Sequence, residues 1–177
     1  MREHLAEAIH TLQKIDADIA WEPAQKLHCT LKFLGDSSDK TIIGIGDAIH
    51  ILAEDMPPFE LTATIVGAFP HWRGPRIIWA GLEDSTGGLV KFQKRLDRSL
   101  ASIGFTMEER EFTPHITLGR VNTLRNIPEL LQAAENVTFP IDHFTSGHIH
   151  IVKSDLTPTG SVFSIMKSFP LVGKVRV

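Results

Sequence analysis

Two stretches decide how this sequence is interpreted: Leu27-His28-Cys29-Thr30-Leu31-Lys32-Phe33 and His115-Ile116-Thr117-Leu118. Both contain the pattern His-x-Thr-Leu, and nearly half of the chain separates the two histidines. A sequence of this composition is expected to contain such a string only about 0.07 times by chance. The pair therefore indicates an internal duplication, with one copy in each half of the chain.

Both copies alternate between polar and apolar residues, which predicts a β-strand with one covered face. Successive side chains of a strand point to opposite faces, so His28 and Thr30 are expected on one face and Cys29 on the other. The same alternation places His115 and Thr117 together. Each copy can therefore line a cleft with one imidazole and one hydroxyl.

Two imidazoles that enter one cleft from opposite lobes suit an in-line displacement at phosphorus, in which a base activates the entering oxygen and an acid protonates the leaving oxygen. Imidazole has an ordinary pKa near 6.5, so one ring can be neutral while the other is protonated. The threonine hydroxyls can donate to phosphate oxygens without a metal. A single histidine beside a threonine would as readily be a plain cross-strand residue, and the duplication argues against that interpretation.

The rest of the chain alternates between helical and strand patterns. Helices are predicted over residues 2–16, from a cap at Ser37 or Ser38 to the break at Pro57, over 89–103 and over 128–134. An extended stretch is expected over residues 19–21, and strands are predicted over residues 27–33, 59–68, 76–82, 115–121, 137–141, 144–153 and 161–167. No linker separates the halves, so we expect one domain over residues 1–177, built from two similar αβ lobes.

Composition limits the classes of function. The net charge of −3 and the pI of about 6.3 disfavour a protein that neutralises many phosphates along a duplex. A single cysteine, Cys29, fits a reducing cytoplasm and excludes a thiolate cluster for a metal. No apolar stretch reaches the roughly 20 residues that cross a bilayer. We expect a cytoplasmic monomer with no membrane role.

The sequence resembles the two-histidine (2H) phosphoesterases, and within them the RNA 2′,3′-cyclic phosphodiesterases historically called 2′-5′ RNA ligases. Four blocks carry the resemblance in order: Leu27-His28-Cys29-Thr30-Leu31-Lys32-Phe33-Leu34-Gly35, Arg76-Ile77-Ile78-Trp79-Ala80-Gly81, Phe112-Thr113-Pro114-His115-Ile116-Thr117-Leu118-Gly119-Arg120 and Ser154-Asp155-Leu156-Thr157-Pro158-Thr159-Gly160. The resemblance covers nearly the whole chain.

The resemblance implies an α+β fold of two pseudo-symmetric lobes, each an antiparallel sheet with flanking helices, around a central cleft. It also implies metal-independent hydrolysis of a 2′,3′-cyclic phosphate at RNA 3′ ends or on nucleotides, which leaves a 2′-phosphate and needs no cofactor. His28 and His115 would be the acid–base pair, and Thr30 and Thr117 would hold phosphate.

Two further roles follow from the resemblance. Arg120 would add an anion contact, and Phe33 would offer a face on which the terminal base stacks. Both residues lie five positions after a histidine, an odd offset that turns them away from the histidine face of an ideal strand. Their use therefore requires a bulge or strong twist near Lys32 and Gly119. Core packing is the alternative for Phe33, and an exterior charge is the alternative for Arg120.

Members of this family begin with a strand of the type Arg-x-Phe-x-Ala-Ile before the first helix, and this sequence starts within the helix. The absence of that strand predicts an unpaired sheet edge. It also keeps open an alternative function, a non-catalytic module that binds RNA ends or nucleotides on the same fold.

Two other groups of residues keep alternatives open. His143, His148 and His150 could ligate zinc in a metallohydrolase, although a polar strand face explains them better. The loop from His71 to Arg76 could contact RNA through Trp72 and its arginines, or be a plain solvated turn. Trp79 is expected in the core.

Overall fold

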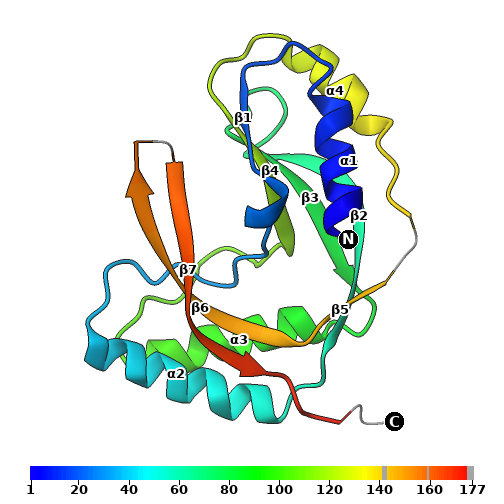
Figure 1. Ribbon diagram of the computed structural model, residues 1–177. Helices are drawn as coiled ribbons and strands as arrows, with labels where there is room; N and C mark the ends of the chain where they lie inside the picture. Colours follow the sequence, from blue (N-terminus) through cyan, green and yellow to red (C-terminus); the bar gives the residue numbers. More distant parts are fainter. Residues whose placement is uncertain (141–142, 159, 175–177) are drawn as a thin grey trace. The chain divides into compact units, whose positions relative to one another are not determined.

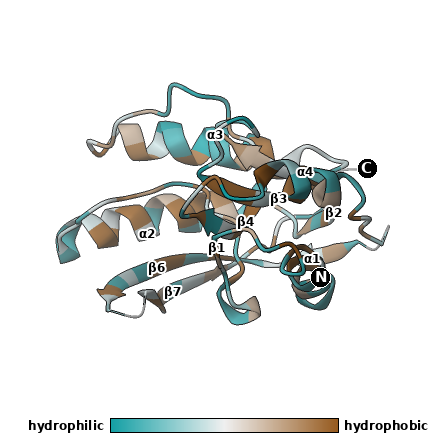
Figure 2. Cartoon of the chain, turned by 90° about the horizontal axis from the view of Figure 1, so that it is seen from above, coloured by the Kyte–Doolittle hydropathy of each residue, from teal (hydrophilic) through white to brown (hydrophobic). Residues whose placement is uncertain are grey.

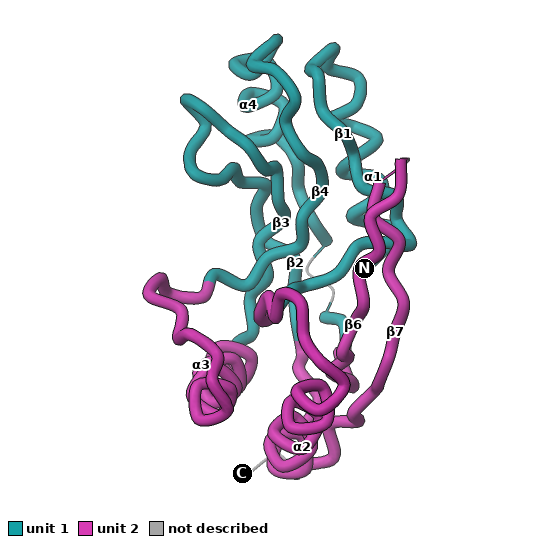
Figure 3. The backbone as a smooth tube through the Cα atoms, turned by 90° about the vertical axis from the view of Figure 1, so that its left-hand side faces the viewer, with its two compact units in different colours: residues 1–30, 61–85, 113–144 teal, residues 31–60, 86–112, 145–177 magenta. Residues whose placement is uncertain are grey.

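The computed structural model describes residues 1–140, 143–158 and 160–174, which form two compact units. Unit 1 consists of residues 1–30, 61–85 and 113–144, and unit 2 of residues 31–60, 86–112 and 145–177 (Figure 3). The units therefore interleave along the chain, and neither is a sequence half. No helix in the described ranges is long and apolar enough to cross a bilayer.

A sheet of five strands, most of whose residues belong to unit 1, forms the framework of that unit, and its strands β1 to β4 pair antiparallel (Figure 1). Its order is β1 (Ile19–Trp21), β4 (His115–Val121), β3 (Ile77–Asp84), β2 (Phe59–Phe69) and β5 (Phe144–Ser146). The predicted hairpin is confirmed, because β2 pairs with β3 from Leu61 opposite Asp84 to Phe69 opposite Ile77. The strand predicted over 137–141 is not formed at residues 137–140, and residue 141 lies outside the described residues.

Two helices belong to unit 1. Helix α1 (Arg2–Leu12) packs against α4 (Ile127–Glu135) and against the short 3-10 helix η1 (Ala24–Lys26). The apolar stripe of α1 is buried, as its spacing predicts: Leu5, Ala8, Ile9 and Leu12. The predicted end of α1 at residue 16 is wrong by one turn, because the chain turns after Leu12 toward β1. Ile116 and Leu118 of β4 are buried, so one face of the sheet contributes to the core.

Unit 2 contains α2 (Asp39–Glu54), α3 (Gly88–Ala101) and the long hairpin of β6 (His148–Thr157) and β7 (Gly160–Pro170). Ser38 caps α2, since its hydroxyl accepts a hydrogen bond from the Thr41 N–H at 3.2 Å, as predicted. Helix α2 packs against α3 and β7, with hydrophobic and hydrophilic residues alternating along it (Figure 2). The buried Phe59 and Phe92 meet edge to face at 5.8 Å.

The predicted strand over residues 27–33 is not present. Leu27 leaves η1 in an extended conformation, but residues 27–34 join neither sheet. The Leu31 carbonyl of this segment accepts a hydrogen bond from the buried Gln93 amide at 3.4 Å instead of joining a strand ladder. The β-propensity of the segment is therefore overridden by tertiary contacts.

Candidate active site

The N-terminal half of β4 carries the second His-x-Thr-Leu copy and aligns its polar residues on one face. His115 lies opposite Gly81 of β3, and Thr117 lies opposite Trp79. The register then shifts, so that Gly119 lies opposite Ile78 and Arg120 opposite Ile77. The shift is the irregularity predicted near Gly119, and it returns Arg120 to the face of His115 and Thr117.

Arg120 is an exposed cation with a carboxylate nearby. Its Nε lies 3.7 Å from Oε1 of Glu22, and 62% of its side chain is exposed. Glu22 follows β1 directly and is held against β4 by a hydrogen bond from its N–H to the Leu118 carbonyl at 2.8 Å. Sequence reasoning did not find Glu22, because no pattern within one strand reveals a neighbour across the sheet.

His115 packs against two aromatic rings. The Phe69 ring meets the imidazole edge to face at a centroid distance of 5.0 Å, and the Trp79 ring lies at 6.2 Å. Trp79 is half-buried beside the candidate site instead of in the core, and its buried Nε1 has no hydrogen-bond partner among the described residues. These contacts restrict the orientations that the imidazole can adopt.

Gly67 makes this packing possible. A Cβ atom on Gly67 would lie 2.2 Å from Cζ2 of Trp79, which is far inside van der Waals contact. The indole therefore lies directly on the backbone of β2 and reaches Phe69 at a centroid distance of 4.9 Å. The sequence offers only the glycine as a signal for this close approach.

The two histidines share one hydrogen-bonding arrangement. Nδ1 of His28 lies 2.6 Å from the Lys26 carbonyl, and Nδ1 of His115 lies 2.7 Å from the Thr113 carbonyl. In both cases the acceptor is the main chain two residues earlier. A carbonyl oxygen only accepts, so Nδ1 must carry a proton in each ring. Proton exchange with a ligand is thereby assigned to Nε2 of both imidazoles.

Cys29 connects the two copies of the pattern. Its thiol accepts a hydrogen bond from the backbone N–H of His115. Burial raises the pKa of the Cys29 thiol to about 11, although this hydrogen bond opposes the shift. Residues 28–30 and residue 115 therefore lie together within unit 1. The expectation that the histidines come from opposite lobes is wrong for these units, since both belong to unit 1.

The register of β4 explains why the His115 N–H is available to Cys29. The Leu82 N–H donates to the Pro114 carbonyl at 3.0 Å, and Gly81 lies directly opposite His115. In an antiparallel pair this arrangement turns the N–H of His115 away from β3. The N–H is then directed to the side on which Cys29 lies.

Of the six predicted site residues, five belong to unit 1: His28, Thr30, His115, Thr117 and Arg120. Thr30 and Thr117 are half-buried, and His28 is exposed. Phe33 belongs to unit 2 and is 83% exposed, so the alternative that it packs in the core is wrong. Its stacking role stays a prediction.

The metal-site alternative is not supported by the side-chain positions. His143 lies in unit 1, with its Nδ1 2.8 Å from the Thr62 hydroxyl, whereas His148 and His150 lie in unit 2. The latter two rings stack in parallel at 6.0 Å. Within the described part of the chain, no three His, Cys, Asp or Glu residues form a group that could hold a metal ion.

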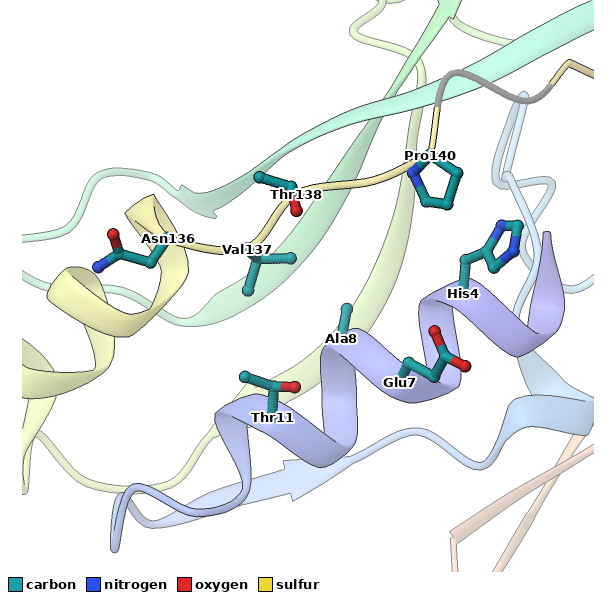
Figure 4. A pocket seen from close by; sticks show the side chains of 8 residues that line it. All are labelled: His4, Glu7, Ala8, Thr11, Asn136, Val137, Thr138 and Pro140. Carbon is teal, nitrogen blue, oxygen red and sulfur yellow. The ribbon is translucent and has the colours of Figure 1, made fainter.

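Two hollows occur in unit 1 apart from these residues. One, of about 210 Å³, lies between α1 and the segment after α4 (Figure 4), and it is lined by His4, Glu7, Ala8, Thr11, Asn136, Val137, Thr138 and Pro140. The other, of about 460 Å³, is lined by the β2–β3 loop and the region around the start of α4. Neither histidine of the repeated pattern lines them.

Comparison with solved structures defines the class of fold. The protein TT0787 of Thermus thermophilus superimposes with a TM-score of 0.83 at 24% identity, covering 98% of this chain and 93% of that chain. Escherichia coli LigT complexed with 3′-AMP gives a TM-score of 0.70 at 26% identity, covering 97% and 92%. The predicted α+β fold of the 2H phosphoesterases is thereby confirmed.

Sequence comparison identifies the family. The profile described as the 2′-5′ RNA ligase superfamily matches residues 1–158, and the chain belongs to this superfamily. The RNA 2′,3′-cyclic phosphodiesterase of Methanothermobacter thermautotrophicus is 30% identical over 174 residues, covering 97% of this chain and 92% of that protein. The protein of the same name from Thermotoga maritima is 31% identical over 166 residues, covering 94% and 87%.

Proposed function

We propose that this protein hydrolyses the terminal 2′,3′-cyclic phosphate of RNA to a 2′-phosphate by metal-independent acid–base catalysis. The observation that carries the proposal is the matched pair of Nδ1 hydrogen bonds at His28 and His115, in segments that Cys29 holds together. The names of the relatives from Methanothermobacter thermautotrophicus and Thermotoga maritima support the same substrate.

The chemistry requires one neutral and one protonated ring. Nε2 of the neutral imidazole removes a proton from water, and the water oxygen forms a new bond to phosphorus. The bond from phosphorus to the 3′ oxygen breaks, and Nε2 of the protonated imidazole supplies the proton that the leaving oxygen needs. Because the rings end the step with exchanged protonation states, proton transfer through solvent restores the starting state.

The non-bridging oxygens carry negative charge throughout this displacement. The hydroxyls of Thr30 and Thr117 are the neutral donors in the proposal, and the guanidinium of Arg120 is the cationic one. Thr117 and Arg120 share the face of His115, which supports their joint use on one phosphate. Glu22 would keep the exposed guanidinium close to the sheet before substrate binds.

The test uses an oligoribonucleotide that ends in a 2′,3′-cyclic phosphate. Wild type is expected to form the 2′-phosphate, and His28→Ala and His115→Ala are each expected to lose about 10²–10⁴-fold in kcat. His10→Ala, at an exposed position on α1, is the matched control and should retain activity. Unchanged turnover in either active-site variant would refute the mechanism. Tight binding of the RNA end without product would favour the non-catalytic module.

A further inference from the structure

The loop between β2 and β3 builds a pocket that the proposed catalytic steps do not use. Trp72 and Arg73 of this loop form one side of the hollow of about 460 Å³. The lining residues on the other side come from the start of α4 and the turn before it: Leu124, Ile127, Pro128 and Leu131. All of them belong to unit 1. A volume of this size is within the usual range for small-ligand pockets.

The walls of the pocket are held in place by the backbone. The Gly74 N–H donates to the His71 carbonyl at 3.2 Å and closes the turn that carries Trp72. The Arg76 N–H donates to the Phe69 carbonyl at 2.7 Å, which ties the loop to the end of β2. On the opposite wall, Ile127 is buried at 6% exposure. The pocket is therefore preformed.

The apolar surface in this pocket is more exposed than a core element would be. Trp72 is half-buried, and Leu124 is 59% exposed. A flat ring fits between an indole and aliphatic side chains. One face of the ring would stack on the indole, and the other face would contact the aliphatic groups. A nucleobase is a ring of this kind, and base stacking on an aromatic side chain needs no particular base.

Arginine side chains occur both at the pocket and at the candidate active site. Arg73 and Arg76 are exposed, and neither has a carboxylate within 4.0 Å among the described residues. Arg120 lies opposite Ile77, the residue after Arg76, and the Val121 N–H donates to the Arg76 carbonyl at 3.0 Å. The three guanidinium groups therefore originate at one end of the sheet, where a phosphate backbone would find complementary charge.

We propose that this pocket binds a base of the RNA strand upstream of the terminal nucleotide, with Trp72 as the stacking platform and with Arg73 and Arg76 as contacts for the intervening phosphates. The inference deepens the proposed function and rests on it, because the strand must run from the pocket toward a cyclic phosphate held near Arg120. The β2–β3 loop would then bind an RNA strand more tightly than a mononucleotide.

The experiment compares two substrates, adenosine 2′,3′-cyclic phosphate and a five-nucleotide RNA that ends in the same group. Trp72→Ala is expected to raise the KM for the pentanucleotide about 5- to 100-fold, in line with the strength of base stacking, and to leave the mononucleotide KM unchanged. Trp72→Phe keeps an aromatic face and should restore most of the difference. Arg73→Gln combined with Arg76→Gln should also raise only the pentanucleotide KM, and the increase should shrink at high salt.

Affinity for a five-nucleotide RNA ending in a 3′-phosphate, compared with that for 3′-AMP, provides a readout that does not require turnover. Equal effects of Trp72→Ala on the long and short ligands, or no effect on either, would overturn the assignment of the pocket. Absence of turnover by wild type on both cyclic substrates would refute the proposed function instead. In that case a selective loss of pentanucleotide affinity in Trp72→Ala would still support the pocket.

Discussion

At the scale of single residues, the repeated pattern supplies two histidines and also determines which ring nitrogen of each histidine carries a proton. Each histidine donates Nδ1–H to the carbonyl two residues before it. In each copy the acceptor lies only two residues before the histidine, so the bond depends on the local backbone. A duplicated sequence can therefore give both histidines the same tautomer. The rings of Phe69 and Trp79 add a packing contact to the His115 imidazole.

A substitution at Gly67 tests whether the packing of Trp79 and Phe69 against His115 matters for turnover. Gly67→Ala would force the Trp79 ring away from the sheet, because the new Cβ would lie 2.2 Å from Cζ2. We expect a loss of about 1–3 kcal/mol in stability from overpacking. We also expect kcat to fall roughly 10- to 100-fold through displacement of His115.

The control for this substitution is Gly74→Ala, whose Cβ would lie 3.8 Å from the nearest atom of His71. It should change neither the stability nor kcat appreciably. If Gly67→Ala folds with an altered stability but a normal kcat, the aromatic contacts do not position His115. The measurements are denaturant unfolding and steady-state kinetics on the cyclic-phosphate oligonucleotide.

The Cys29 thiol gives a pH-dependent prediction. Burial raises the pKa of the thiol to about 11, so the folded protein holds the thiol proton at pH values where the unfolded chain has released it. The contribution of this thiol to the unfolding free energy should therefore be constant below about pH 8.5, the ordinary pKa of cysteine, and should decline as the pH rises toward 11. Cys29→Ala should remove that part of the decline.

Alkylation measures the same group directly. Cys29 is the only cysteine of the chain, so the rate of iodoacetamide labelling reports this thiol alone. The labelling rate of the folded protein should reach its half-maximum near pH 11, and that of the protein in urea near about pH 8.5. Equal labelling rates at pH 8 in the two states would contradict the desolvation of the half-buried Cys29 thiol beside His115.

At the scale of elements, the segment from Leu27 to Leu34 shows how tertiary contacts replace a predicted strand. The side chain of its Lys32 is 4% exposed. The Lys32 ammonium donates to Asp97 of α3 at 2.5 Å, to the Thr106 carbonyl at 2.7 Å and to Glu108 at 3.1 Å. Asp97 also accepts the Glu108 N–H at 2.9 Å. All three Lys32 protons are therefore used within unit 2, and the segment is tied to α3 and to the loop after it.

The Lys32 network predicts a large effect on stability. Burial lowers the pKa of Lys32, but the hydrogen bonds that its ammonium donates to Asp97 and Glu108 outweigh this effect and raise the pKa. Lys32→Met leaves the Asp97 carboxylate buried without its cation, so we expect a loss of about 3–5 kcal/mol in the free energy of unfolding. Lys94→Met, on the exposed side of α3, is the matched control and should change it by less than about 0.5 kcal/mol.

Acid unfolding tests the same network through Asp97, the carboxylate partner of Lys32. Burial raises the pKa of Asp97, whereas the bonds from Lys32 and from the Glu108 N–H lower it, and the net shift is downward. The stabilisation is therefore present above the ordinary pKa of aspartate, about 3.9, and is lost as the pH falls through the lowered value. Asp97→Asn should weaken this loss, and an unchanged acid transition would argue against the ion pair.

At the scale of the whole molecule, the chain passes repeatedly between two units. Unit 1 collects the five candidate site residues from two distant parts of the sequence. The β2–β3 hairpin lies between those parts along the chain and supplies Trp79, Phe69 and the Trp72 loop to the same unit. His115, Thr117, Arg120 and the loop that carries Trp72 therefore depend on one sheet, whereas His28 and Thr30 belong to the same unit without joining a sheet.

The proposed mechanism predicts that the protein needs no metal ion for activity. The proposed mechanism obtains its base and its acid from imidazole and its charge stabilisation from hydroxyl and guanidinium donors, so EDTA should leave kcat and KM within about twofold of their values without chelator. Metal analysis of untagged protein before and after chelation is the control. A loss of activity in EDTA that is restored by zinc would favour a metallohydrolase.

Much of this structure could be predicted from the sequence alone. The hairpin of β2 and β3 and the cap of α2 follow from residues close together in the chain, because periodicity and local hydrogen bonding are local properties. The His-x-Thr-Leu duplication follows from a comparison of distant parts of the sequence. The irregularity near Gly119 follows from strand alternation together with the role that the family resemblance implies for Arg120. Only the tertiary structure decided that residues 27–34 are not a strand, that Lys32 is buried, and that Trp79 rests on Gly67 beside His115. Those outcomes depend on which distant side chains satisfy a carbonyl or fill a space, and no spacing within a single element encodes that choice.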